Sequence, residues 1–262
     1  MYRFNLLLKY FYYYFTSSTK HQIHSPFVFE LLTNVISTRK KFPEFKKINA
    51  VRTLLLNSNK EIVRKDKGAG SSVNSLQKKS VVKNIAKYSA ISKKQGEWLF
   101  RLVKYFNASN IIELGTSLGI STLYQALANE KAKIISIEGC DETAQTAKEN
   151  FEKLHIFNIE LLNGDFQTQL PVALSQLNQL DFVFFDGNHQ KEATLNYVHL
   201  CLPFIHNNSI FVFHDIRWSK KMEESWKEIK QHPLVTVTID LFFMGLVFFR
   251  KEQAKEHFII RF

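Results

Sequence analysis

The chain has 262 residues, 45% of them hydrophobic, which is enough to bury a sizeable core and excludes an intrinsically disordered protein. Its net charge of +11 is unevenly distributed: residues 1–110 carry 21 Lys and Arg against 5 Asp and Glu, and the remainder carries 14 against 19. The first 110 residues are therefore expected to form a distinct basic region. Such a surface is either simply solvated or attracts an anionic substrate, a phospholipid or a nucleic acid.

The only two cysteines, Cys140 and Cys201, lie far apart in the sequence. They form neither a metal-ligand spacing nor a disulfide framework. Both are expected to be packing residues of a cytoplasmic protein, where thiols stay reduced.

The segment MYRFNLLLKYFYYYF, residues 1–15, predicts an aromatic-rich amphipathic helix. It is not a secretory signal, because Lys9 interrupts the apolar run and no small-residue cleavage site follows. The run is also too short to span a bilayer. We expect the helix to pack on the protein itself, with docking on a membrane surface or on a partner as the alternative.

Further helices are predicted in the first region. Ser25 and Pro26 form a typical helix start, with a capping side chain and a first-turn proline. Residues 75–89 and 93–106 also have helical character, with residues 68–75 as a loop between them. The second of these helices has its apolar residues at helical spacing, namely Trp98, Leu99, Leu102 and Val103.

From Asn110 onward, short apolar runs alternate with amphipathic segments. The predicted strands are 111–114, 133–138, 159–163, 181–186 and 209–214, and the predicted helices are 120–129, 141–154, 191–204 and 222–231. Repeated strand–helix units with short connections indicate a parallel sheet covered on both faces. The last two runs, LVTVTID and GLVFFR, are too close together for a crossover helix and should pair antiparallel.

Two glycine-containing segments compete for the ligand. KDKGAGSS, residues 65–72, follows a segment too charged to be a buried central strand, and is expected to be a flexible loop, with a lid over the site as the alternative. IIELGTSLGIST, residues 111–122, has the strand, the tight turn and the helix start that a ligand cradle requires. The carboxylate of Glu113 would repel a pyrophosphate but suits a cationic ligand such as S-adenosylmethionine.

Three acids end successive strands: Glu113, Glu138 and Asp165. In a doubly wound fold, an acid at the position of Glu138 binds ribose hydroxyls. Asp165 is suited to an adenine amino group, with Phe166 as a neighbour for the ring. Acids at three successive strand ends favour a nucleoside-binding site over three unrelated solvated residues.

With these motifs in place, residues 111–250 resemble a class I S-adenosylmethionine-dependent methyltransferase of the small-molecule O-methyltransferase-like branch. The segments that carry the resemblance are IIELGTSLGIST, IISIEG, NGDF and LDFVFFDGNH. It implies a Rossmann-like fold with a mostly parallel seven-stranded sheet, an antiparallel last strand, and a helical N-terminal region over residues 1–110 on the substrate side of the cofactor-binding domain 111–262.

The resemblance also implies the residues around the cofactor. Those around its methionine part would be Glu113, Gly115, Thr116, Ser117, Gly119 and Ser121. Glu138 and Gly139 would hold the ribose, Asp165 and Phe166 would frame the adenine, and Asp186 would border the same pocket.

Methyl transfer needs aligned reactants and, for a protonated acceptor, a base. The catalytic candidates follow the fourth and fifth strands and are Asp186, His189, His214 and Asp215. Related cation-dependent enzymes hold a divalent metal at two such acids, which Asp186 and Asp215 match. Because Ile216 replaces the asparagine of that ligand set, a metal-free site with His189 or Asp186 as the base is favoured.

The sequence therefore predicts a methyltransferase for a small or medium organic acceptor, with oxygen as the favoured target. A nucleic-acid methyltransferase is the first alternative, suggested by the basic region, but the turn after the fourth strand is DGNH and no RNA-binding signature is present. A nicotinamide oxidoreductase would require a G-x-G-x-x-G loop, which is missing. A non-catalytic cofactor-binding scaffold is the remaining alternative. The acceptor and the oligomeric state are not encoded in any readable pattern.

Overall fold

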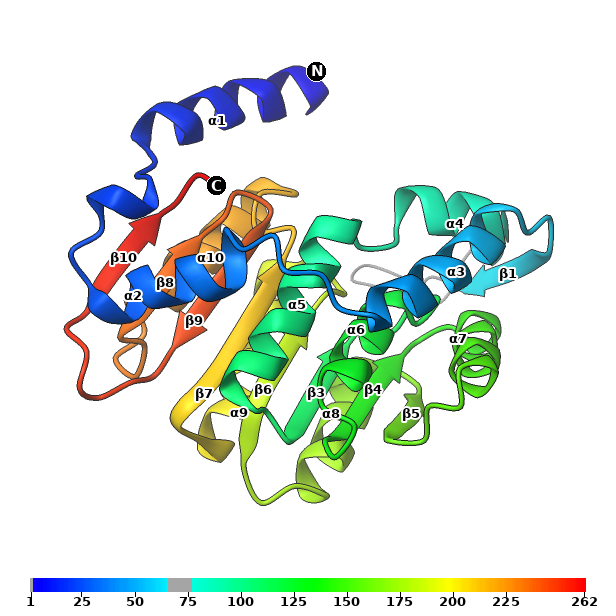
Figure 1. Ribbon diagram of the computed structural model, residues 1–262. Helices are drawn as coiled ribbons and strands as arrows, with labels where there is room; N and C mark the ends of the chain where they lie inside the picture. The colour runs from blue at the N-terminus through cyan, green and yellow to red at the C-terminus, as the bar shows by residue number, and fades with distance from the viewer. Residues whose placement is uncertain (1, 66–76) are drawn as a thin grey trace.

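The computed structural model describes residues 2–65 and 77–262. Its centre is one eight-stranded sheet, shown in Figure 1. In sheet order the strands are β10 (Glu256–Ile259), β8 (Val237–Asp240), β9 (Met244–Phe248), β7 (Ile205–His214), β6 (Leu180–Phe185), β3 (Asn110–Leu114), β4 (Lys133–Glu138) and β5 (Ile159–Asn163). All strands from β5 to β7 pair in parallel, whereas β9 runs antiparallel to both β7 and β8. The predicted Rossmann-like sheet with a reversed last strand is confirmed.

The sheet has one strand more than the seven predicted. The additional strand, β10, pairs in parallel with β8 at the edge of the sheet. It is four residues long and begins with the polar pair Glu256 and His257, so it has little of the apolar pattern that identifies buried strands. Ser18 forms a bridge to Ile260 immediately after this strand, which attaches the N-terminal segment to the edge.

Helices cover both faces of the sheet because the side chains of each strand alternate. Ile111 packs in the same hydrophobic cluster as the N-terminal helices, whereas Ile112 packs in the cluster on the opposite face. The helices around the sheet are α5 (Lys93–Phe106) from the N-terminal region and α6 (Ile120–Ala128), α7 (Asp141–Lys153), α8 (Phe166–Ser175), α9 (Lys191–Cys201) and α10 (Lys220–Gln231), with a 3-10 turn η3 (Leu202–Phe204). Of these, α8 lay outside the sequence-based prediction, since its sequence contains Pro171 and two polar glutamines.

The N-terminal region is mostly helical, as predicted. It contains α1 (Tyr2–Thr16), η1 (Lys20–Gln22), α2 (Pro26–Leu31), the π-helical turn η2 (Leu32–Ile36), α3 (Glu44–Leu56) and α4 (Val82–Tyr88). The helix start at Ser25 and Pro26 is confirmed, because the Ser25 hydroxyl accepts a hydrogen bond from the Val28 amide and Pro26 is the first helical residue.

The predicted helix over residues 75–89 is partly wrong. Residues Gln77–Val81 form strand β2, which pairs antiparallel with β1 (Glu61–Lys65), and the helix begins only at Val82. The adjacent β-branched residues Val81 and Val82 favour an extended start, and pairing with β1 supplies the hydrogen bonds that a helix would otherwise provide. The predicted loop at 68–75 and the proposed lid of GAGSS lie outside the described residues.

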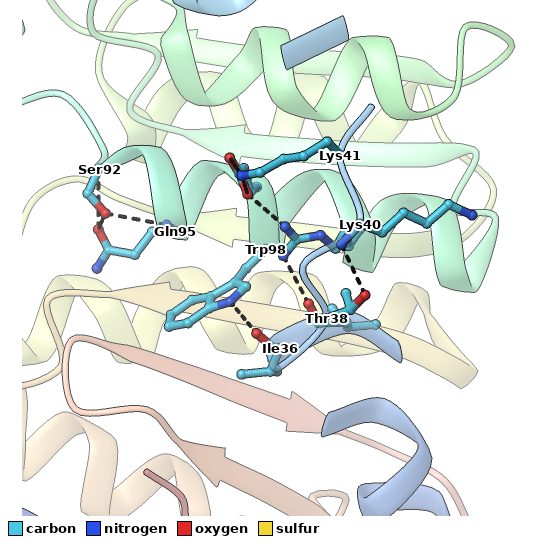
Figure 2. A network of polar contacts seen from close by, with 10 residues as sticks. Ile36, Thr38, Lys40, Lys41, Ser92, Gln95 and Trp98 are labelled. Carbon is cyan, nitrogen blue, oxygen red and sulfur yellow. Dashed lines mark hydrogen bonds and ion pairs between the residues drawn. The ribbon is translucent and has the colours of Figure 1, made fainter. Parts of the chain in front are cut away.

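Helix α5 joins the N-terminal region to the sheet domain. Figure 2 shows Trp98 donating its indole hydrogen to the Ile36 carbonyl at 3.0 Å. Arg101 donates to the Val35 carbonyl at 3.1 Å and to Glu97 at 2.7 Å. The predicted apolar face of α5 is buried as expected. A single hydrophobic cluster therefore runs from the N-terminal helices into the sheet, and the two regions share a core.

Candidate active site

The predicted ligand loop has the tight geometry expected from its glycines. It connects β3 to α6, and Gly115 and Gly119 adopt φ values of +104° and +83°. A Cβ atom at Gly115 would lie 2.3 Å from the Asp186 carbonyl oxygen, and one at Gly119 would lie 2.5 Å from the Phe151 ring. Any larger residue at either position would be strained by its backbone conformation and by these contacts. The loop therefore lies directly against the end of β6.

Glu138 braces this loop from the neighbouring strand. One of its carboxylate oxygens accepts a hydrogen bond from the Ser117 amide at 2.8 Å, and the other accepts one from the Cys140 amide at 3.0 Å. A carboxylate is acceptor-only when ionised, the type of group that binds hydroxyls of a ligand. Gly139 follows Glu138 and is partly exposed.

Asp165 and Phe166 follow β5 on the same edge of the sheet. Asp165 caps the start of α8 by accepting a hydrogen bond from the Gln167 amide at 2.8 Å. The Phe166 ring lies against Gly187, where an added Cβ would approach the ring to 2.4 Å. The ring also packs edge-on against Tyr197 at a centroid distance of 5.9 Å. Phe166 thus connects the end of β5 with the loop that follows β6.

Glu113 occupies a different environment from the one expected for a direct ligand contact. Its side chain is fully buried and accepts hydrogen bonds from Thr122, from Ser136 at 2.6 Å and from Gln125 at 2.7 Å. Burial raises its pKa to about 7, against the opposing effect of these hydrogen bonds.

Two other predicted ligand residues are buried behind the loop together with Glu113. The Thr116 hydroxyl lies 2.5 Å from that of Ser136, and Ser121 is buried at the start of α6. In this structure these side chains lie among β3, β4 and α6. The sequence did not reveal this, because the donors come from separate elements.

The ends of β6 and β7 bring together three of the catalytic candidates. His214 Nδ1 lies 2.8 Å from Asp186 Oδ1 and 3.6 Å from Asp215 Oδ2. Burial alone lowers the pKa of His214, but the charge and hydrogen bond of Asp186, together with the charge of Asp215, raise it to about 9. At neutral pH the centre of this cluster is therefore an imidazolium held between two carboxylates.

Asp215 has an unusual backbone and a perturbed acidity. Its φ of +55° lies in the left-handed region, which Asp tolerates better than most residues. Burial raises the pKa of its carboxyl, opposed by the charge of His214 and reinforced by that of Asp186. The interaction with His189 also lowers this pKa, so His189 lies near Asp215.

His189 and Trp218 stand on the loops after β6 and β7. Their rings lie 6.3 Å apart at an angle of 41°, and Trp218 is 53% exposed. The two rings are thus tilted neighbours on the loops that follow the strands carrying Asp186 and His214.

The side chains of this cluster do not fit a divalent metal ion. Within residues 2–65 and 77–262 no group of three or more His, Cys, Asp or Glu has the arrangement of a metal site. The His214 imidazolium already supplies positive charge to both carboxylates, and Ile216, which replaces the third ligand, is buried. A metal cation placed between these two carboxylates would have to compete with the His214 imidazolium for them.

We therefore expect metal removal to leave the protein unchanged. Thermal unfolding should give the same Tm in the presence of EDTA and in millimolar MgCl₂ or MnCl₂, because the Asp186 and Asp215 carboxylates are already paired. A metal-dependent rise in Tm that disappears in Asp215→Asn would contradict this assignment.

Arg217 is a residue of this region that the sequence did not single out. Its guanidinium makes a two-pronged ion pair with Asp240 at 2.6 and 2.7 Å, and donates to the Phe242 carbonyl at 2.9 Å. The pair anchors the loop that carries Asp215 to the turn between β8 and β9. Only the pairing of β8 and β9 beside β7 brings these residues together, so no local sequence signal reveals it.

Comparisons with known proteins agree with this architecture. Residues 112–216 match a protein family described as a methyltransferase domain. Among curated proteins, the flavonoid 3',5'-methyltransferase of Vitis vinifera is 29% identical over 139 residues, covering 51% of this chain and 58% of that protein. The catechol O-methyltransferase of Mycobacterium tuberculosis is 24% identical over 129 residues, covering 48% and 57%. The chain thus spans less than two thirds of the length of these curated relatives.

Solved structures show the same fold over more of the chain. The O-methyltransferase of Bacillus cereus in complex with SAH has a TM-score of 0.57 at 17% identity, covering 81% of this chain and 93% of that one. The cofactor-bound Rv0187 from MTB has a TM-score of 0.58 at 18% identity, covering 88% and 100%. Residues 112–216 are thus similar to methyltransferase domains, and the whole chain has the Rossmann-like fold of these solved O-methyltransferase and cofactor-bound structures.

Proposed function

We propose that this chain binds S-adenosylmethionine and transfers its methyl group to a small organic acceptor, preferentially at oxygen. The observation that carries the proposal is the continuous edge formed by the Gly115–Gly119 loop, Glu138 and Phe166 beside the acid–histidine cluster. The relatives that methylate small phenolic compounds, by their names, support the same class of acceptor.

The charges of the edge support a cationic cofactor over a dinucleotide. Glu138, Asp165 and Asp186 line it at successive strand ends, and a pyrophosphate placed among them would be repelled. S-adenosylmethionine carries no phosphate and has a sulfonium and an ammonium group. We assign Glu138 to the ribose hydroxyls and Phe166 with Asp165 to the adenine. Glu113, Thr116 and Ser121 act by positioning the loop.

The remaining residues would serve the acceptor. When bound, S-adenosylmethionine supplies an electrophilic methyl group with a good leaving group. Asp186 and Asp215 hold His214, whose second ring nitrogen, Nε2, can donate to the acceptor oxygen and stabilise its negative charge. His189 takes the proton of the acceptor, and the exposed Trp218 ring forms a wall of its pocket.

The structure also supports proposals for the role of the N-terminal region and for the cellular location. We propose that residues 1–110 form the acceptor side of the site over the cofactor-binding domain of residues 111–262, since α1 packs on the turn after β8 and the loop of Arg217. Cys140 and Cys201 are both free and buried, which is compatible with the cytoplasmic location that we propose.

Isothermal calorimetry with S-adenosylmethionine, S-adenosylhomocysteine and NAD tests the cofactor assignment. We expect binding of the first two, and a loss of ~1–3 kcal/mol of binding free energy in Glu138→Ala, because the ribose acceptor and the brace on Ser117 are removed together. Glu160→Ala is the matched control, since Glu160 is an acid on the adjacent strand β5 whose partners in the described part of the chain are Lys133 and Gln176. Binding of NAD alone would reject the proposal.

A further inference from the structure

Helix α1 carries large apolar side chains on both its inner and its outer side. On its inner side Tyr10 and Tyr13 pack against Phe242, at centroid distances of 5.0 and 5.2 Å. Its outer side exposes large hydrophobic side chains, with Phe15 at 79% and Tyr12 at 73% exposure; the others on this side are Leu7, Leu8 and Phe11. A helix with apolar side chains on opposite sides normally has both sides covered. The outer side of α1 is therefore suited to a further apolar environment.

Three contacts fix α1 so that this side faces outward. The Tyr13 hydroxyl donates to the Ile260 carbonyl, and Lys9 forms an ion pair with Glu223 of α10 at 2.6 Å. The Arg217 guanidinium lies 5.5 Å from the Tyr13 ring. Figure 1 shows α1 at the periphery of the molecule, past the carboxyl end of β10. The exposed side chains of α1 thus form one apolar surface on the side that faces away from the protein. We name this surface the outer face; it consists of Leu7, Leu8, Phe11, Tyr12 and Phe15.

The charged residues close to α1 in the sequence are basic. Residues 1–29 contain no Asp or Glu, and Lys20 comes shortly after the helix. Arg261 donates to the Tyr14 carbonyl at 3.0 Å, and its guanidinium lies 5.0 Å from the Tyr14 ring. A second copy of the chain docked face to face about a two-fold axis would bring these cations against their own copies. A surface of negative charge would instead be attracted to them.

We propose that the outer face docks on an anionic lipid surface. Aromatic side chains with a polar tip prefer the boundary between water and hydrocarbon, and basic residues next to them bind anionic headgroups. The helix of 15 residues is roughly 22 Å long, short of the hydrocarbon thickness of a bilayer. None of the helices in the described part of the chain has the length and apolar character of a membrane span. The helix therefore lies in the plane of the interface.

Co-sedimentation of the whole chain with vesicles tests this docking, and it does not depend on methyl transfer. We expect binding to vesicles of phosphatidylglycerol and phosphatidylcholine, weakened by high salt, and little binding to phosphatidylcholine alone. The double variant Tyr12→Glu, Phe15→Glu should bind at least about tenfold more weakly. Its Tm should equal that of the original chain, since both side chains are exposed.

Phe157→Glu is the matched control. Phe157 is 82% exposed but precedes β5, at the opposite edge of the sheet from β10. Unchanged vesicle binding in this variant, together with the loss in the α1 variant, supports the docking. The proposal is overturned if the original chain does not bind anionic vesicles, if both variants lose binding equally, or if light scattering shows a dimer that only the α1 variant disrupts. Equal binding to neutral and anionic vesicles would also overturn it.

Discussion

His214→Asn should lose methyl transfer by about a hundredfold or more while its affinity for S-adenosylmethionine changes little. The substitution removes the positive charge between Asp186 and Asp215, so two partly buried carboxylates are left close together and the acceptor oxygen loses its stabilising donor. Production of S-adenosylhomocysteine with a panel of phenolic and aliphatic-alcohol acceptors measures transfer, and calorimetry measures cofactor binding.

The chain contains a matched control for this variant. His206 lies 2.8 Å from Asp181 through its Nε2 atom, in a similar histidine–aspartate pair at the opposite ends of β6 and β7. His206→Asn should therefore alter stability without a specific loss of transfer. Equal losses of transfer in both variants would mean that His214 acts only through the fold.

The same histidine predicts how stability depends on pH. The pKa of His214 is raised from its ordinary value of 6.5 to about 9 in the folded chain. The interaction of the His214 imidazolium with its carboxylates therefore contributes fully to the free energy of unfolding below pH 6.5. This contribution is lost as the pH rises through about 9. The total is roughly 3 kcal/mol of unfolding free energy. Urea unfolding between pH 6 and 10 should show this decline in unfolding free energy in the original chain and no such decline in His214→Asn. The same decline in both proteins would contradict the assignment to His214.

Asp240→Asn is expected to destabilise the chain by ~3–5 kcal/mol, the usual result of leaving one partner of a buried ion pair unpaired. Asp240 is almost completely buried and binds Arg217 through both carboxylate oxygens. The variant removes the negative charge and leaves the guanidinium with one of these two oxygens as an acceptor. Since Tyr13 and Phe242 both pack on this guanidinium, α1 should loosen as well. Urea unfolding gives the free energy, and hydrogen exchange gives the protection of α1.

Glu149→Gln provides the comparison for this second variant. Glu149 pairs with Lys60 at 3.3 Å, and both side chains are well exposed, so its loss should cost less than ~1 kcal/mol. Similar small losses in both variants would show that the Arg217–Asp240 pair does not hold this part of the molecule together.

Much of the fold was predictable because its signals are local. The strand and helix patterns from Ile111 onward each fit within one element, and Gly115 and Gly119 mark backbone positions where the structure indeed has positive φ. The reversed strand was predictable for the same reason, since the short connection before β9 leaves no room for a crossover helix.

The features of the fold and the site that the sequence did not predict depend on residues that are distant in the sequence. β2 is a strand because β1 pairs with it, and β10 is a strand because β8 is available at the edge. Likewise, the sequence showed Glu113 as an acid at a strand end, but not the three donors that bury it. His214 and Asp186 were both candidates, yet their direct hydrogen bond follows only from the parallel pairing of β6 with β7.

A crystal structure of the chain with S-adenosylhomocysteine would test the cofactor site most directly. We expect its ribose hydroxyls within hydrogen-bonding distance of Glu138, its adenine beside Phe166, and its sulfur facing the His214 cluster. Density for the nucleoside at any other surface, or a chain that remains empty at saturating concentration, would contradict the proposed function.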